Sequence, residues 1–540
     1  MTATRFFLFK LARVYYTEIF FFFLLILAFS ISTSRLVMSM SQLAMASLWV
    51  LDGRYREKLS LFFHNRMALI LSSLFALHII GLFYSNDMDS ALKDLRIKTP
   101  LILLPFFFSS LNPSNIKKSI WILLAFIAGV FYASAFVSME HWINGIDVKA
   151  LLSARFIKHM RFSLDISMAL FSALLLSVLI WRKAINHVLT LILVFWFFVF
   201  MLMMSALSAF ATSFLMILYL TFFLYFHSSK KNFLFSLSGS AISLIAIVYF
   251  GFSFLNPIVF PTEKQELQPL EAKTMNGNYY NTYTNTLTEN GKRIYSFVCE
   301  KELKSEWEKR SSFSFDGADL LDQELKATLI RYLNSLDLPK DSFGLSKLSN
   351  QDILNIENGI ANKRYATESG IKVRLMQFAF ELEQAKTNSN PSGYSFGQRL
   401  EYWKVSWYII RKNIVFGYGS GDNDQTMHLA YLQTHSLLPT EYWLRPHNQF
   451  LSIWLSFGLF GLLVFLFCLF YPPLFLKAFK NPFYVLFFIS IIASFFVEDT
   501  LETQSGVTYF VFFNAYFLML WPQNESKGKL LFVEQKKAGN

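Results

Sequence analysis

Apolar runs of membrane-spanning length, each about 17 to 25 residues long, recur along this chain. Short polar turns separate most of them, and one long polar segment interrupts the series late in the sequence. The pattern predicts an all-α polytopic integral membrane protein with about twelve transmembrane helices. The runs cover residues 17–33, 36–51, 67–84, 96–111, 119–138, 162–181, 187–204, 206–226, 233–255, 448–471, 482–497 and 506–521.

Lysine and arginine residues predict the orientation of these spans, because cytoplasmic loops carry an excess of positive charge. With a cytoplasmic amino terminus, the short loops on that side are basic throughout, and an even number of spans returns the carboxyl terminus to the cytoplasm. The predicted organisation is spans one to nine in residues 1–255, an outward segment over 256–447, spans ten to twelve in 448–521 and a cytoplasmic tail over 522–540. In a bacterium the outward side is the periplasm.

The long polar segment predicts a mainly helical periplasmic domain of about 190 residues, which is a normal domain size. Residues 256–295 show no period and are predicted to be irregular. Pro391 and Gly393 predict a loop over residues 388–397. Apolar residues three and four apart predict helices over 319–336, 350–362 and 371–386.

The composition agrees with a membrane protein. Of the 540 residues, 54% are hydrophobic and 16% are charged, against roughly a quarter charged in soluble domains. The net charge of +12 would suggest nucleic acid as a partner in a soluble protein, but membrane topology accounts for it here. Cys299 and Cys468 give no disulfide framework. The first apolar run is predicted to be a retained helix and not a signal peptide.

Two outward loops are basic against the topology rule, which suggests an anionic ligand at the outer leaflet. An arginine near the membrane interior costs roughly 2.5 to 3.5 kcal/mol on insertion scales, and an anion would offset that cost. The alternative is interfacial snorkelling together with an Arg161–Asp165 pair at helical spacing. The two loops contain Lys93, Arg96 and Lys98, and Lys149, Arg155, Lys158, His159 and Arg161.

The sequence predicts a helix over residues 397–411 that has Arg399, Trp403 and Trp407 on one face. Tryptophans in such a position are usually interfacial anchors. The helix is therefore predicted to lie at the outer leaflet, and Arg399 is a candidate ligand for an anion.

The motif Gly417-Tyr418-Gly419-Ser420-Gly421-Asp422 has two interpretations. Alternating glycines can expose N–H groups to a phosphate, but no strand precedes them and no dinucleotide fingerprint follows. The favoured alternative is a turn after a helix, with Asp422 capping the next helix. Asp422, Asp424 and His428 imitate a metal site, but their spacing argues against one.

The segment Arg445-Pro446-His447-Asn448 marks the point where the polar segment ends and the tenth apolar run begins. It places a cation and a titratable imidazole at a membrane surface. Pro446 fixes the backbone direction, and Asn448 is predicted to be the N-cap of the helix that enters the bilayer. The alternative is that the segment only begins a helix and has no further role.

Taken in order, these motifs resemble the O-antigen ligase family of bacterial polytopic glycosyltransferases. The resemblance implies a GT-C-like fold with His447 and Arg399 as catalytic residues, and it relates Arg96 and Arg161 to the family's outer-leaflet basic residues. Many members have Ser-Arg at the outer end of a middle span, where this chain has Ser205-Ala206-Leu207-Ser208, so the resemblance does not extend to a phosphate contact from that position. The motifs are Arg399 with Trp403, Asn413 before the glycine motif, the segment from Arg445 to Phe450, Gly458-Leu459-Phe460-Gly461, Glu498-Asp499 and Gln504-Ser505-Gly506.

The family moves a finished glycan from undecaprenyl diphosphate to the lipid A core at the periplasmic face of the inner membrane, a step of lipopolysaccharide biosynthesis. The resemblance implies that His447 takes the proton of an acceptor sugar hydroxyl. The neighbouring Arg445 favours the neutral imidazole that this role requires.

The leaving diphosphate gains negative charge, and fixed guanidinium groups stabilise that charge through bidentate hydrogen bonds. The resemblance therefore assigns diphosphate binding to Arg96, Arg161, Arg399 and Arg445. Glu498 and Asp499 would orient an arginine or act as an alternative base, and Asn448 would support them. No cofactor and no metal are expected, because the guanidinium groups take the place of a divalent ion.

Four alternatives remain open from the sequence. An O-antigen polymerase uses the same lipid-linked donor, and so does a relative that glycosylates protein. A transporter or flippase would place ionisable groups in the middle of spans, and His78 is the clearest such residue. A scaffold without catalysis is the last alternative. The expected partners are the lipid-linked glycan, the lipid A core and membrane lipids, and no oligomeric state is predicted.

Overall fold

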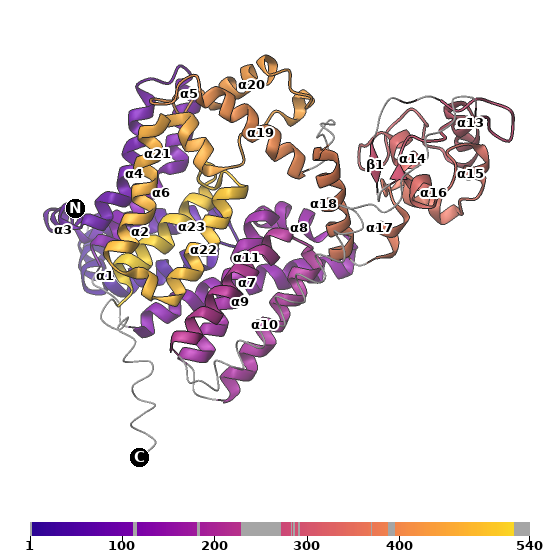
Figure 1. Ribbon diagram of the computed structural model, residues 1–540. Helices are drawn as coiled ribbons and strands as arrows, with labels where there is room; N and C mark the ends of the chain where they lie inside the picture. The colour runs from indigo at the N-terminus through magenta and orange to yellow at the C-terminus, as the bar shows by residue number, and fades with distance from the viewer. Residues whose placement is uncertain are drawn as a thin grey trace. The chain divides into compact units, whose positions relative to one another are not determined.

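The computed structural model of the chain describes residues 3–111, 116–180, 184–227, 272–281, 283, 287–289, 292–368, 370–386 and 395–522 (Figure 1). Helices dominate these residues. The chain divides into two compact units. Unit 1 comprises Met1–Ser240, Tyr402–Ser436 and Trp443–Asn540, and unit 2 comprises Ala241–Glu401 and Leu437–Tyr442. The predicted domain over 256–447 is therefore divided between them, since residues 402–436 and 443–447 pack with unit 1.

Unit 1 contains a helix at each predicted apolar run that lies in the described residues, except the fourth run. The ninth predicted run, 233–255, and the tail from residue 523 lie outside the described residues. The helices are α1 (Ala3–Ser30), α2 (Arg35–Asp52), α3 (Tyr55–His64), α4 (Arg66–Leu82), α5 (Met88–Lys98), α6 (Pro100–Ser109), α7 (Ile116–Asn144), α8 (Val148–Arg155), α9 (His159–Leu179), α10 (Ala184–Met204), α11 (Leu207–His227), α20 (Asn423–Gln433), α21 (Gln449–Phe475), α22 (Pro482–Val497) and α23 (Gln504–Ala515).

Short helical turns complete unit 1, and one long helix runs through the boundary between the units. The turns are η2 (Ala478–Lys480), η3 (Thr500–Glu502) and the π-helix η4 (Tyr516–Leu520). The long helix is α19 (Ser395–Ile410), which confirms the helix predicted over 397–411.

Helix α23 is the centre of unit 1. Every residue from Ser505 to Ala515 is buried, as expected for a helix that is apolar on all sides. It packs against α6, α4 and α22. The ring of Phe513 lies 5.1 Å from that of Phe126 and 5.5 Å from that of Phe487. The last helices of the chain are therefore packed among those of its first half.

The fourth predicted run, residues 96–111, is not one helix. Helix α5 ends at Lys98 and α6 begins at Pro100. A proline is favourable at the first position of a helix but cannot continue the helix before it, which explains the break. With ten residues, α6 is about 15 Å long, too short to cross a hydrocarbon core of about 30 Å. Helix α6 alone is therefore shorter than a span, and the predicted fourth span, which also includes the end of α5, stays a prediction.

Among the described residues, four helices are long and apolar enough to cross a membrane: α7, α9, α10 and α21. Helices α2 and α3 meet at an angle of 120° and would count as a fifth span if the pair were one. Shorter apolar segments lie in α1, α4, α11 and α22. The chain is thus a multi-pass membrane protein, and the predicted number of about twelve spans stays a prediction.

Unit 2 is a small helical body with one two-stranded antiparallel sheet, in which Thr288 pairs with Arg293 and Glu289 with Lys292. Leu303, Trp307, Leu329 and Leu333 lie in its core. Its elements are β1 (Thr288–Glu289), β2 (Lys292–Arg293), α13 (Glu300–Arg310), α14 (Leu325–Ser335), α15 (Ser342–Ser346), α16 (Asn350–Glu357), α17 (Lys363–Thr367), α18 (Gly370–Lys386) and η1 (Thr440–Tyr442).

Two of the sequence predictions for unit 2 need correction. The helix predicted from residue 319 begins at Leu325, because the Asp319 carboxylate accepts hydrogen bonds from the N–H groups of Leu321 and Gln323 and holds that segment in a turn. The loop predicted over 388–397 lies mostly outside the described residues, and its last residues, from Ser395, already belong to α19.

The glycine motif of residues 417–421 packs against a break in α21. Gly458 has φ 64° and ψ −165°, which interrupts the helix. Its neighbour Leu459, whose N–H would bond to Leu455 in a continuous helix, donates to the Ile414 carbonyl instead (2.7 Å). The Leu455 carbonyl accepts from the N–H of Tyr418 (3.0 Å). A Cβ at Gly458 would lie only 2.0 Å from the Val415 carbonyl oxygen, so glycine allows the two backbones to meet.

We expect Gly458→Ala to lower the free energy of unfolding by more than about 2 kcal/mol, since it adds a steric clash to an unfavourable φ. Gly53→Ala is the matched control, because Gly53 also has a positive φ (71°) but nothing lies within 4 Å of the Cβ position. Thermal unfolding of the purified protein in detergent measures both. Equal losses in the two variants would contradict the role assigned to the backbone contact.

Candidate functional site

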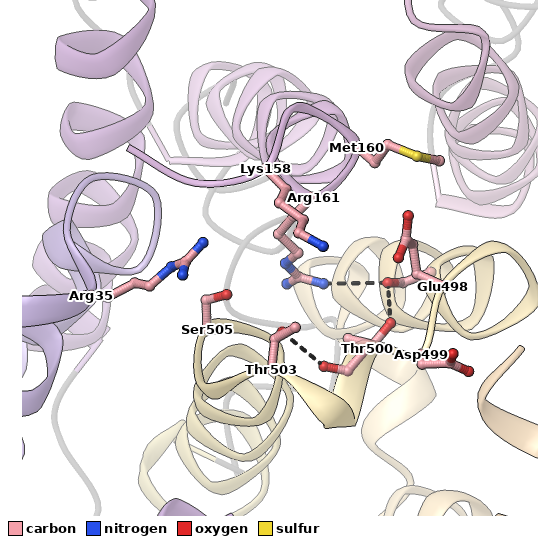
Figure 2. A pocket seen from close by; sticks show the side chains of 10 residues that line it. Arg35, Lys158, Met160, Arg161, Glu498, Asp499, Thr500, Thr503 and Ser505 are labelled. Atoms are coloured by element: carbon pink, nitrogen blue, oxygen red, sulfur yellow. Dashed lines mark hydrogen bonds between the residues drawn. The ribbon is translucent and has the colours of Figure 1, made fainter. Parts of the chain in front are cut away.

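Residues from three parts of unit 1 line one pocket (Figure 2). They come from the start of α2, the start of α9 and the segment from the end of α22 to the start of α23. All of these positions were predicted to lie at the outer ends of spans, so the pocket agrees with the predicted alternation of span direction. The lining residues are Arg35, Lys158, Met160, Arg161, Ser494, Glu498, Asp499, Thr500, Thr503 and Ser505.

Arg161 has the most unusual surroundings in this pocket. Its side chain is almost completely buried, and its guanidinium carbon lies 3.6 Å from the centre of the Tyr509 ring. One nitrogen donates a long hydrogen bond to the Ser494 hydroxyl (3.4 Å), and another lies 3.4 Å from an Asp165 oxygen. Among the described residues, Nε and Nη2 have no hydrogen-bond acceptor. A buried guanidinium with unused donors at a pocket is complementary to an anion.

Two further cations, Lys158 and Arg35, line the same pocket. Both side chains are exposed, and neither forms an ion pair with any side chain in the described part of the chain. In Figure 2, Lys158 lies beside Arg161 while Arg35 approaches from α2. The sequence analysis included Lys158 only as part of a basic loop and missed Arg35. The available clue was that Arg35 directly follows Ser34, the N-cap of α2, at an outward end.

The two acids of the pocket have different surroundings. Asp499 is 8% exposed, and its carboxylate accepts from the N–H of His447 (2.9 Å), the N–H of Asn448 (2.9 Å) and the hydroxyl of Ser452 (2.6 Å). Burial raises the pKa of the Asp499 carboxyl, and the Ser452 hydrogen bond opposes that effect. Asp499 therefore holds the start of α21, while Glu498 remains partly exposed in the pocket.

His447 lies next to Glu498. Its Nδ1 is 3.6 Å from a Glu498 oxygen, and its side chain is 28% exposed. The imidazole ring lies 5.6 Å from the ring of Tyr402. His447 has φ 48°, a left-handed conformation that non-glycine residues seldom adopt. Asn448 is the N-cap of α21 as predicted, and its side chain accepts from the N–H groups of Phe450 and Leu451.

Arg445 is held by carboxylates and does not line the pocket. It makes two hydrogen bonds to Asp424 (2.6 and 3.0 Å) and a third to Glu502 (3.0 Å). Burial alone would lower the pKa of Arg445, but these partners raise it, so the guanidinium stays charged. The structure therefore shows Arg445 in contact with protein acids, whereas the sequence suggested a diphosphate ligand.

The two remaining predicted arginines are not among the lining residues. Arg96 is exposed on α5. Arg399 belongs to unit 2, where its Nη1 donates to the Ser395 carbonyl (3.3 Å). Their proposed contacts with a diphosphate stay predictions.

The glycine motif does not offer its N–H groups to a phosphate. The N–H groups of Tyr418 and Gly419 donate to carbonyls of α21, and that of Gly421 donates to the Ser85 hydroxyl (3.2 Å). Asp422 occupies the N-cap position of α20 but does not cap it. Its carboxylate accepts instead from the N–H groups of Asn86 (2.8 Å) and Asp87 (2.8 Å), which corrects the predicted capping role.

The described residues contain no group of three or more His, Cys, Asp or Glu side chains arranged to hold a metal ion. Of the residues that imitated such a site in the sequence, Asp422 is bonded to Asn86 and Asp87, and Asp424 is paired with Arg445.

We expect Asp499→Asn to lower the free energy of unfolding by about 1 to 3 kcal/mol, because an amide cannot accept from all three donors and leaves a buried N–H unsatisfied. Glu498→Gln should cost less, since Glu498 is partly exposed. Thermal unfolding in detergent compares the two isosteric changes. A larger loss for Glu498→Gln would contradict the different roles assigned to the two acids.

A comparison with protein families matches residues 360–466 to the O-antigen ligase family. The match includes Arg399, the glycine motif, Arg445 and His447, but it covers only about a fifth of the chain. No curated protein matches the chain. With its apolar helices, the matched segment indicates a membrane enzyme of the glycosyltransferase type. The resemblance to the O-antigen ligase family is therefore confirmed over residues 360–466.

Proposed function

We propose that this protein transfers a glycan from undecaprenyl diphosphate to a sugar of the lipid A core at the periplasmic face of the bacterial inner membrane. One observation carries the proposal: a buried arginine with unused hydrogen-bond donors, Arg161, faces a pocket whose acid Glu498 lies beside His447. The anion-binding groups that line the pocket would thus lie close to a candidate base, which contacts the pocket through Glu498. The family match over residues 360–466 supports the same class of reaction.

The basic residues of the pocket would bind the diphosphate of the donor. Arg161 offers a preformed fork for two phosphate oxygens, while Lys158 and Arg35 add charge from the exposed side. As the bond between the anomeric carbon and the phosphate oxygen breaks, the electron pair stays on the diphosphate. Fixed cations stabilise that charge most strongly in the transition state.

His447 would take the proton of the acceptor hydroxyl as its oxygen bonds to the anomeric carbon. If Nδ1 carries a hydrogen toward Glu498, the lone pair of the imidazole lies on Nε2 and can act as the base. The separation of 3.6 Å between Nδ1 and Glu498 is longer than a hydrogen bond, and catalytic hydrogen bonds often tighten only when substrate is bound. Glu498 would thus orient His447 and stabilise its charged form.

We expect deletion of the gene to leave the lipid A core bare while long polymer accumulates on undecaprenyl diphosphate. Wild-type protein restores the transfer and His447→Ala does not, because the acceptor hydroxyl then lacks its base. Lipopolysaccharide gels read beside the carrier-linked glycan measure both pools. If single repeat units still reach the core, the protein is a polymerase. Glycosylated protein with an unchanged core would indicate protein as the acceptor, and unchanged profiles would oppose all three reactions.

We expect Arg161→Lys to lower kcat/KM for the lipid-linked donor by about tenfold or more, because an ammonium cannot replace a bidentate guanidinium. Arg56→Lys is the control, since Arg56 is exposed on α3 and does not line the pocket. Initial rates with purified protein and donor measure the two variants. Equal effects would oppose the assignment of the diphosphate to this pocket.

Transfer should also persist when EDTA is added, because the proposed mechanism uses guanidinium groups where other enzymes use a divalent ion. Loss of transfer on chelation, followed by recovery with Mg²⁺, would show that a metal takes part.

A further inference from the structure

Ionisable side chains from five parts of unit 1 form a continuous series of contacts near His447. His78 on α4 lies 2.7 Å from Asp94 on α5, and Asp94 lies 2.8 Å from Lys98. Lys98 reaches Glu502 in η3 (3.0 Å), and the same Glu502 oxygen binds Arg445 (3.0 Å). The last contact of the series is the ion pair between Arg445 and Asp424 on α20 (2.6 Å).

Lys98 is at the centre of this series of contacts and is completely buried. Asp94 is 8% exposed, and the Glu502 side chain is 14% exposed. Burying an ion costs several kcal/mol, and a buried pair often adds no more stability than apolar residues of the same size. Stability alone is therefore a weak reason for placing a lysine here. A buried pair with fixed partners can instead specify one arrangement of the chain.

This series of ion pairs would fix the arrangement of the two segments around His447. Arg445 lies two residues before His447, and Glu502 lies four residues after Glu498. The Arg445–Glu502 ion pair and the hydrogen bond from His447 N–H to Asp499 join the same two segments twice. His447 has a left-handed backbone, which costs roughly 1 to 3 kcal/mol and persists only where the surroundings hold it. The two connections lie at this residue and two residues before it, and they are suited to hold it.

We propose that Glu502, fixed by the buried Lys98, is a positioning residue that acts through Arg445 to hold His447 and Glu498 in their working geometry. The inference rests on the proposed function and assigns Glu502 no contact with substrate. It also assigns Arg445 to positioning and leaves diphosphate binding to the basic residues of the pocket.

The test compares Glu502→Gln with Asp52→Asn in transfer assays with lipid-linked donor. Asp52 is a matched control, because one of its oxygens also binds an arginine and a buried lysine, Arg54 and Lys58, at 2.8 Å each. It lies at the far end of α2 from Arg35, about 25 Å along the helix. Glu502→Gln should lower kcat by about tenfold to a hundredfold, as misplaced catalytic groups do, and leave the donor KM within about twofold. Asp52→Asn should leave both constants unchanged.

A second variant separates positioning from folding. In Lys98→Met with Glu502→Met, both members of the ion pair are removed and Asp94 keeps its contact with His78, so the thermal stability should be higher than that of Glu502→Gln. The kcat should stay low, because Arg445 has lost its connection to η3. Recovery of kcat together with stability would overturn the inference, and so would a Glu502→Gln protein that has wild-type kcat or only a raised donor KM.

These outcomes also distinguish the inference from the proposed function. If His447→Ala abolishes transfer while Glu502→Gln keeps wild-type kcat, the positioning role is wrong and the proposed function stands. If His447→Ala transfers at the wild-type rate, the proposed function itself fails.

Discussion

The polar end of unit 1 depends on the Asp499 carboxylate. A helix begins with N–H groups that have no partner inside the helix, and at the start of α21 the Asn448 side chain satisfies two of them. Asp499 accepts from the two N–H groups just before, those of His447 and Asn448. Because Asp499 comes from the segment after α22, these bonds join two parts of the chain. They place His447 beside Glu498, so the candidate base and the pocket share one support.

The cations at this end of unit 1 fall into two groups. Lys98 and Arg445 are each bound to two carboxylates, and their charges are used within the protein. Lys158 and Arg35 have no ion pair among the described residues, and Arg161 has only a distant one, to Asp165. The second group lines the pocket. This division explains how one surface can be rigid and still offer positive charge to a diphosphate.

Much of the helical organisation could be predicted from local pattern. Apolar runs located the long helices, Asn448 was predicted as an N-cap, and the Arg161–Asp165 pair followed from helical spacing. The partners of Arg445 could not be predicted, because Asp424 and Glu502 lie 21 and 57 residues away in the sequence.

Arg35 lines the pocket only because the folded chain brings the starts of α2, α9 and α23 to one place, which no single segment of the sequence reveals. The glycine motif was difficult for the same reason. Its glycines are explained by a close contact with the break at Gly458, and only the folded chain shows that contact.

The most direct test of the account is a cryo-electron microscopy structure of the full chain with undecaprenyl diphosphate bound. The account predicts both phosphates in the pocket, with oxygens about 3 Å from the Arg161 guanidinium and with Lys158 and Arg35 closer to them than to any protein acid. Arg445 should keep its bonds to Asp424 and Glu502. A diphosphate bound elsewhere, with Arg161 still beside Ser494 and Asp165, would contradict the central claim that this pocket is the donor site.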